Sequence, residues 1–102
     1  MPSQLRIYKI KAGQMKNWLS FFHEKVVPLH KKFGIPAHAG WVNAADSEFI
    51  WVRDFAEGEP IEEQEKRYVN WDERLRVIGN ESKSFVESMV VRVVECAYER
   101  ET

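Results

Sequence analysis

The sequence predicts an α+β domain whose strands and helices follow the order βαββαβ. Three observations predict this fold class. Residues 48–55 (EFIWVRDF) alternate with a period of two and are apolar on both faces, as in a strand at the middle of a covered sheet. From residue 14 onward, apolar residues fall three and four positions apart, which indicates a helix. Residues 85–96 are rich in valine and long enough for a further strand.

The first strand and the first helix occupy the N-terminal third of the chain. Residues 4–11 are expected to form the strand, because β-branched and aromatic side chains alternate with others there. The helix then runs from residue 14 to Gly34, which is typical of a helix end. Pro28 lies inside this helix and removes one backbone hydrogen bond, so we expect a bend over residues 24–28.

A β-hairpin is expected in the middle of the chain. Residues 37–43 and 48–55 have strand-like composition, and the polar segment 44–47 between them has the length of a hairpin loop. The second and third strands should therefore be antiparallel neighbours.

The second half of the chain is expected to supply one more helix and one more strand. The helix begins at Glu59 or Pro60, with carboxylates near its positive end, and its pattern is weakest over residues 70–72. Residues 85–96 form the last strand, and residues 97–102 form a short charged tail. At 102 residues the chain is one domain, 1–102, with its core over about residues 4–96.

This element order matches the ferredoxin-like arrangement, in which a four-stranded antiparallel sheet has strands one and three at its centre. Two helices cover only one face of such a sheet, so the other face stays bare. We expect the bare face to carry the larger apolar side chains, namely Tyr8, Ile10, Phe49, Trp51 and Phe55. An apolar face of this kind predicts a homodimer through the open sheet face, in which two sheets form an α/β barrel.

Composition excludes several kinds of partner. The net charge is −1 and the pI is near 6.3, so clustered basic charge for nucleic acid or an anionic membrane is not expected. The single cysteine, Cys96, cannot form an intrachain disulfide, which fits a reducing compartment. No apolar stretch is long enough for a signal peptide or a membrane span. A cytoplasmic protein is the expectation.

Four segments together resemble the NIPSNAP family of the dimeric α/β-barrel superfamily. They are LRIYKIKAG (5–13), VVPLHKKFGI (26–35), GWV (40–42) and EFIWVRDF (48–55). The resemblance covers nearly the whole chain and is weakest in the acidic second helix. It implies a dimeric barrel without a dedicated cofactor. It also allows an enzyme, because related barrels include cofactor-independent monooxygenases, isomerases and haem-degrading oxygenases, although no Asn, His and Trp set of the haem-degrading type is found.

The candidate ligand-binding residues combine arginine with aromatic rings and are expected to face the space between the two sheets. They are Arg6, Tyr8, Trp51 and Arg53. Such a group could hold a carboxylate, enolate or phenolate through charge-assisted hydrogen bonds and ring packing. The alternative is that the arginines pair with carboxylates such as Asp54 or Glu48 and that the rings fill the core. Arg6 and Tyr8 look like residues characteristic of the family.

The histidines and the acidic segment give weaker signals. His38, at the start of the second strand, joins the candidate ligand-binding residues because it could abstract a proton if it faced the chamber. His23 and His30 lie about 10.5 Å apart along the helix axis, too far to share one ion, so no metal site is expected. The carboxylates of residues 57–65 are interpreted as a solvated helix face.

Three functions remain open from the sequence. The first is binding of a small aromatic or anionic molecule in the barrel, the second is an enzyme of the cofactor-independent monooxygenase or isomerase type, and the third is a structural or interaction module with a filled barrel. A ligand-sized internal cavity would favour the first two over the third.

Overall fold

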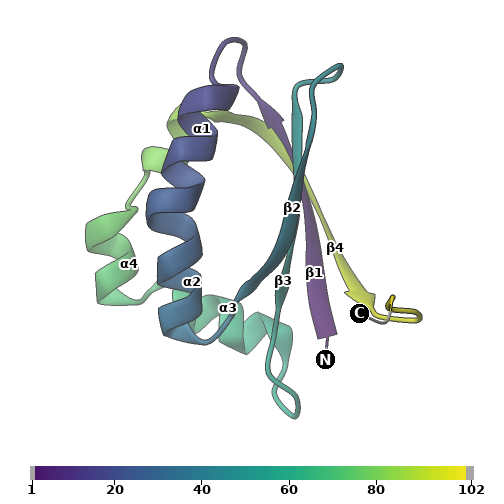
Figure 1. The fold of residues 1–102 in the computed structure, drawn as a ribbon. Helices are drawn as coiled ribbons and strands as arrows, with labels where there is room; N and C mark the ends of the chain where they lie inside the picture. Colours follow the sequence, from purple (N-terminus) through teal and green to yellow (C-terminus); the bar gives the residue numbers. More distant parts are fainter. Residues whose placement is uncertain (1, 101–102) are drawn as a thin grey trace.

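The computed structural model describes residues 2–100 and shows a four-stranded antiparallel sheet with helices on one face (Figure 1). The strands are β1 (Pro2–Ile10), β2 (Ala37–Asn43), β3 (Glu48–Asp54) and β4 (Val86–Glu95). Their order is β2-β3-β1-β4, and every neighbouring pair is antiparallel. The predicted ferredoxin-like fold, with the first and third strands at the centre, is therefore confirmed.

The first helical segment is divided by a π-helical turn. It consists of α1 (Met15–Phe21), the π-helical turn Phe22–Val26 and α2 (Val27–Phe33). The irregularity lies where Pro28 predicted a bend. Pro28 is the second residue of α2, directly after the π-helical turn, and it cannot donate a backbone hydrogen bond to that turn. The segment ends at Gly34, whose φ of 100° is a left-handed conformation that glycine adopts without strain.

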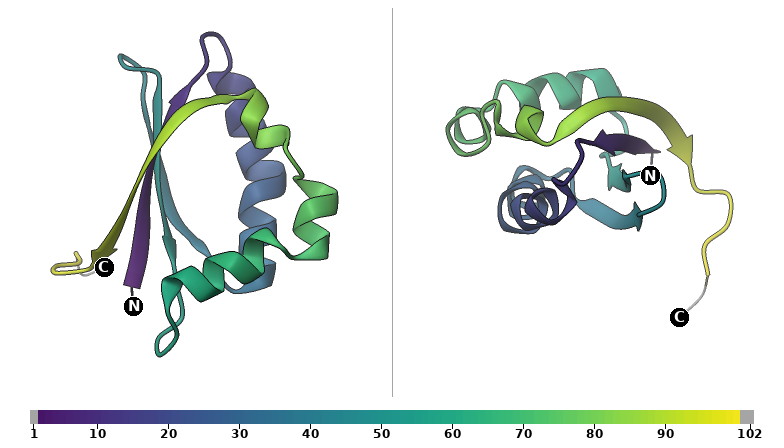
Figure 2. Two further views of the ribbon diagram at one scale, coloured as in Figure 1. Left: turned by 180° about the vertical axis from the view of Figure 1, so that it is seen from behind. Right: turned by 90° about the horizontal axis from the view of Figure 1, so that it is seen from above.

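The second helical segment breaks where its pattern is weakest. Helix α3 (Ile61–Val69) is separated from α4 (Asp72–Val77) by two residues, and a short 3₁₀ turn (Glu81–Ser84) leads into β4. Figure 2 shows both helical segments on the same side of the sheet. None of the helices in the described part of the chain has the length and hydropathy needed to cross a bilayer.

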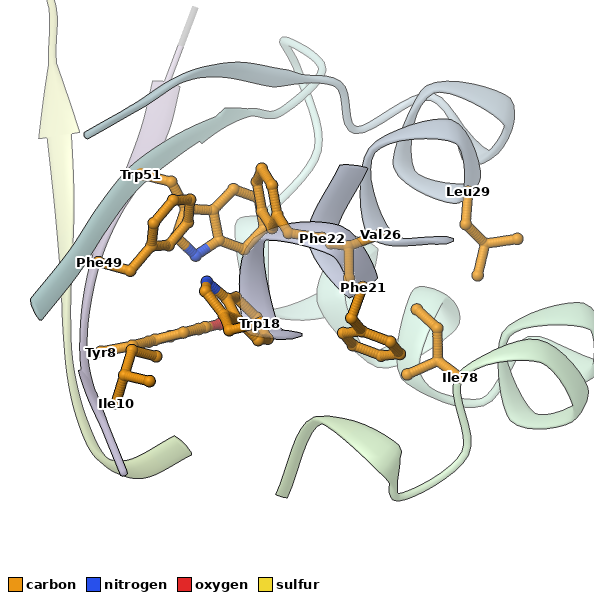
Figure 3. Close-up of a cluster of buried hydrophobic side chains, with 10 residues drawn as sticks. All are labelled: Tyr8, Ile10, Trp18, Phe21, Phe22, Val26, Leu29, Phe49, Trp51 and Ile78. Atoms are coloured by element: carbon orange, nitrogen blue, oxygen red, sulfur yellow. The ribbon is translucent and has the colours of Figure 1, made fainter. Parts of the chain in front are cut away.

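The aromatic side of the sheet faces the helices, which corrects the expectation that it would be bare. The five residues expected on the bare face are between 0% and 7% exposed and lie under the helices: Tyr8, Ile10, Phe49, Trp51 and Phe55. Trp18 and Phe22 of the first helical segment pack among them, mostly edge to face (Figure 3). Because β3 is apolar on both faces, its alternation alone does not choose which face the helices cover.

The opposite side of the sheet, which we call the open face, is aliphatic at its centre and has no helix over it. Its central side chains alternate with the buried aromatic ones along β1 and β3: Leu5, Ile7, Ile50 and Val52. Trp41 of β2 and Val90 of β4 extend it toward the edges and are 54% and 42% exposed. The predicted tail continues from this side without helix or strand over residues 97–100, and residues 101–102 lie outside the described part.

Candidate functional site

A buried arginine stands at the centre of a polar cluster between the sheet and the helices. Arg53 lies on the helix-facing side of β3 and is 4% exposed. Its Nε donates to Gln4 Oε1 at 3.0 Å, and its Nη1 donates to His30 Nε2 at 3.0 Å. Its Nη2 forms an ion pair with Glu65 Oε2 at 2.5 Å. The guanidinium therefore has one hydrogen-bond acceptor on each of its nitrogens, as a buried cation requires.

Three aromatic rings also surround this guanidinium, at 5.4 to 5.9 Å from its central carbon: Trp51, Phe55 and Tyr68. Burial is the main cause that lowers the pKa of Arg53 to about 10, and repulsion from Arg6 is the next. Arg53 thus remains a cation at neutral pH.

His30 is a neutral hydrogen-bond acceptor for this cation. Burial, followed by the charge of Arg53, lowers the pKa of His30 to about 3. Arginine can only donate, so His30 Nε2 must be unprotonated and Nδ1 must carry the hydrogen. Nδ1 then donates to the carbonyl oxygen of Val26 at 2.9 Å, and the hydroxyl oxygen of Tyr68, 3.1 Å from the same nitrogen, is a second acceptor. Both ring nitrogens are engaged, so His30 positions Arg53 and is not free to act as a base.

Arg6 lies beside this cluster on β1 and reaches its solvent-facing edge. Its Nε donates to the Tyr8 hydroxyl at 2.7 Å, and its Nη1 donates to Gln4 Oε1 at 2.6 Å. Its Nη2 donates to the thioether sulfur of Met89 at 3.5 Å. A thioether is a weak acceptor, so this nitrogen has the poorest partner of the three. The side chain of Arg6 is 12% exposed.

The cluster carries more positive than negative charge. Arg6 and Arg53 both lie near one carboxylate oxygen, Glu65 Oε2, at 3.4 and 2.5 Å. A third guanidinium, that of Arg74, lies 5.5 Å from the ring of Tyr68. Two cations that share one anion leave a net positive site, and this site is partly screened from solvent. Chemically, such a site attracts an anion.

Four of the five predicted ligand-binding residues are brought together by the structure: Arg6, Tyr8, Trp51 and Arg53. They face the helices, however, and not the space outside the sheet that a second sheet would enclose. The reason is the phase of β1 and β3, whose aromatic side is the covered one.

His38 is not part of this group, because it lies on the open face. The register of β2 shifts at this residue, since Ala37 pairs with Arg53 and Ala39 pairs with Val52. His38 Nδ1 lies 3.1 Å from Asp54 Oδ2, and the side chain of His38 is 52% exposed. The other oxygen of Asp54 accepts a hydrogen bond of 2.6 Å from Ser3 Oγ.

This pair lines an open cavity of about 420 Å³. The C-terminal segment supplies the rest of its wall, including the exposed thiol of Cys96 and the ring of Tyr98. Among residues 2–100 no group of His, Cys, Asp and Glu side chains could hold a metal ion.

Sequence reasoning missed four members of the cluster: Gln4, His30, Glu65 and Tyr68. Gln4 has the same strand phase as Arg6 and Tyr8, and that signal was available. Glu65 was interpreted as part of a solvated helix face, but it lies three residues before the buried Tyr68 and so shares its side of α3.

The fold and the cluster define a ferredoxin-like α+β domain with a cationic, partly buried site. No family sequence model and no curated protein matches the chain. Among solved structures, an uncharacterized NIPSNAP domain protein from Burkholderia xenovorans is similar with a TM-score of 0.80 and 12% identity, over 99% of this chain and 100% of that one.

Two further structures agree. A NIPSNAP family protein from Agrobacterium tumefaciens has a TM-score of 0.77 and 19% identity, over 92% of this chain and 90% of its own. Another from the same organism, of unknown function, has a TM-score of 0.71 and 15% identity, over 92% and 86%. This chain therefore has the fold of NIPSNAP family proteins, and the likeness that the sequence motifs implied is confirmed at the level of the fold.

Proposed function

We propose that this NIPSNAP-like protein binds a small aromatic anion on the helix-facing side of its sheet, with Arg6 as the residue that receives the anionic group. The observation that carries the proposal is the bond from Arg6 Nη2 to the sulfur of Met89. A carboxylate or phenolate oxygen is a far stronger acceptor for a guanidinium than a thioether is. The excess positive charge of Arg6 and Arg53 over Glu65 also favours replacement of the Met89 sulfur by an anionic oxygen.

The approach to Arg6 runs along β4. Met89 and Val93 lie opposite Tyr8 and Gln4 in the register and so belong to the helix-facing side, yet they are 52% and 61% exposed. The helices therefore cover β1 and β3 but leave this side of β4 open. A methionine side chain is flexible, so Met89 can move aside when an anion binds.

Aromatic character in the ligand is favoured by the surroundings of the cation. The guanidinium of Arg6 lies 5.5 Å from the centre of the Tyr8 ring. Tyr8 in turn contacts Trp18 and Trp51 with centroid distances of 5.5 and 6.2 Å. A flat ring that enters beside Tyr8 would meet ring edges and faces, which is favourable for stacking.

An enzyme would need an acid or a base beside the bound molecule. His30 is neutral and has both nitrogens engaged, and His38 lies across the sheet. Neither histidine is therefore available as a base, and we propose binding as the function ahead of turnover by a monooxygenase or isomerase.

Thermal unfolding in benzoate tests this function, because a ligand that binds only the folded state raises the melting temperature. We expect benzoate, but not neutral benzyl alcohol, to raise the melting temperature of the native protein. Arg6→Gln should abolish the increase. The matched control is Arg76→Gln on α4, where the side chain is 71% exposed and lies 3.9 Å from Glu73 Oε1. An equal increase in Arg6→Gln would show that the anion binds elsewhere.

We also propose that two copies pair through the open face to form an α/β barrel. Four strands about 4.8 Å apart and seven to ten residues long give a sheet about 19 Å wide and about 23 to 33 Å long. Its centre carries only aliphatic side chains on this side: Leu5, Ile7, Ile50 and Val52. A second copy offers the same flat aliphatic surface, so a symmetric face-to-face dimer buries both.

A further inference from the structure

Two buried tryptophans have indole N–H groups without a protein acceptor. Trp18 is 1% exposed and Trp51 is 2% exposed, and Nε1 of each donates to no atom of the described chain. An indole nitrogen can only donate, and a buried one normally finds an acceptor. Two such groups in one core call for a common explanation.

The two N–H groups converge on one place. Trp18 comes from α1 and Trp51 from β3, and in Figure 3 the nitrogens lie on the facing edges of the two indoles, with Tyr8 beside them. Among the described hydrogen bonds the Tyr8 hydroxyl only accepts, from Arg6 Nε at 2.7 Å. Its own hydrogen is thus a third donor in this part of the core, beside the two indole N–H groups that have no partner among the described residues.

We propose that this place receives an oxygen atom of the bound molecule, such as a phenol or carbonyl oxygen on its ring. An oxygen has two lone pairs and can accept from both indoles at once. This inference rests on the proposed function and deepens it. Arg6 receives the carboxylate at the open edge, and the indoles receive a second oxygen at the buried end. The ligand class is an aromatic carboxylate that carries a hydroxyl or keto group on its ring.

The surroundings select for an acceptor and against a cation. The neighbouring charged groups are Arg6 and Arg53, which repel a cation, and their carboxylate Glu65 is already paired with both. His30 contacts the Trp51 ring at 5.2 Å but has no free nitrogen to accept from it. The positive environment strengthens the binding of an oxygen that carries partial or full negative charge.

Indole NMR signals test the inference directly. The chain has four tryptophans, so a proton–nitrogen spectrum has four indole signals, which Trp18→Phe and Trp51→Phe assign. We expect saturating 4-hydroxybenzoate or 3-hydroxybenzoate to move the Trp18 and Trp51 protons downfield, because they gain an acceptor. Trp41 and Trp71 serve as internal controls and should not move. Benzoate, which lacks the ring oxygen, should move the two signals much less.

Affinities provide the second measurement. Each Trp→Phe variant keeps an aromatic ring and loses one N–H, so it should weaken hydroxybenzoate binding about tenfold more than it weakens benzoate binding. If a variant does not fold, the spectra of the native protein still decide the question.

The outcomes separate this inference from the proposed function. Binding that depends on Arg6 but leaves both indole signals unmoved would overturn the inference and keep the proposed function. Indole protons that resonate far upfield and stay there would also overturn it, because they would then donate to the face of the Tyr8 ring. If neither benzoate nor the hydroxybenzoates bind, both proposals fail.

Discussion

The two sides of the sheet differ in what their polar groups do, and the histidines show this best. On the helix-facing side, His30 is 2% exposed and neutral and gives its lone pair to a buried arginine. On the open face, His38 is 52% exposed and pairs with Asp54 next to solvent. The same residue type is a fixed part of the core on one side and a solvated group on the other.

The charges differ in the same way. Arginines outnumber carboxylates around Arg53, whereas the cavity at His38 is lined by the carboxylates Asp54, Glu95 and Glu99 and by no arginine or lysine. The cationic site and the acidic cavity thus lie on opposite faces of a single β-sheet. An anion is drawn to the helix-facing side, which is where the proposed ligand binds.

The largest expected effect is dissociation of the proposed dimer when a charge is introduced on the open face. Val52→Glu places a carboxylate in the middle of the aliphatic surface, and a symmetric dimer would bury it twice without a partner. We expect the dimer dissociation constant to rise by a factor of about 1,000, or roughly 4 kcal/mol. Analytical ultracentrifugation measures the change.

Val69→Glu is the matched control for this variant, because Val69 is 43% exposed but lies on α3, away from the open face. It should leave the dimer intact. A native protein that sediments as a single subunit at micromolar concentration would contradict the proposed dimer.

The pattern of the sequence sufficed for the elements and for their order in the sheet, since both depend on local periodicity and on topological rules. It did not suffice for the side that the helices cover. Both faces of β3 are apolar, and only packing of Trp18 and Phe22 against the aromatic face decides between them. Arg6 and Arg53 were found because charged residues within apolar strands are conspicuous.

His30 and Glu65 escaped prediction for a different reason. Their partners are 23 and 12 residues away along the chain, and both are joined through Arg53. Periodicity reports which side of a helix a residue occupies, but not which side chain from another element meets it. The bulge at His38 is likewise invisible to a simple alternation, because it changes the strand phase by one residue.

The next largest expected effect is a dependence of stability on pH that arises from His30. The pKa of His30 falls from its ordinary value of 6.5 to about 3 on folding. Between these values the unfolded chain binds a proton that the folded chain does not, so the stability from this residue is lost as the pH falls below 6.5. At about pH 4 the loss is on the order of 3 kcal/mol. Urea unfolding at several pH values measures it.

His30→Gln removes the titrating group and keeps an acceptor for Arg53, so its stability should fall less steeply between about pH 6.5 and 4. His23→Gln, at an exposed site of the π-helical turn, should keep the slope of the native protein. Equal slopes in His30→Gln and the native protein would mean that His30 does not resist protonation in the folded state.

The smallest effect concerns His38. The side chain is half exposed, and its hydrogen bond with Asp54 lies next to solvent. His38→Asn keeps a short polar side chain that can still donate to Asp54, so we expect a change of less than about 0.5 kcal/mol in the free energy of unfolding and no change in benzoate binding. Urea unfolding and thermal unfolding in benzoate check the two parts. A loss of benzoate binding in this variant would contradict the separation of the two faces. It would mean that His38 acts through the strand on Arg53 on the helix-facing side.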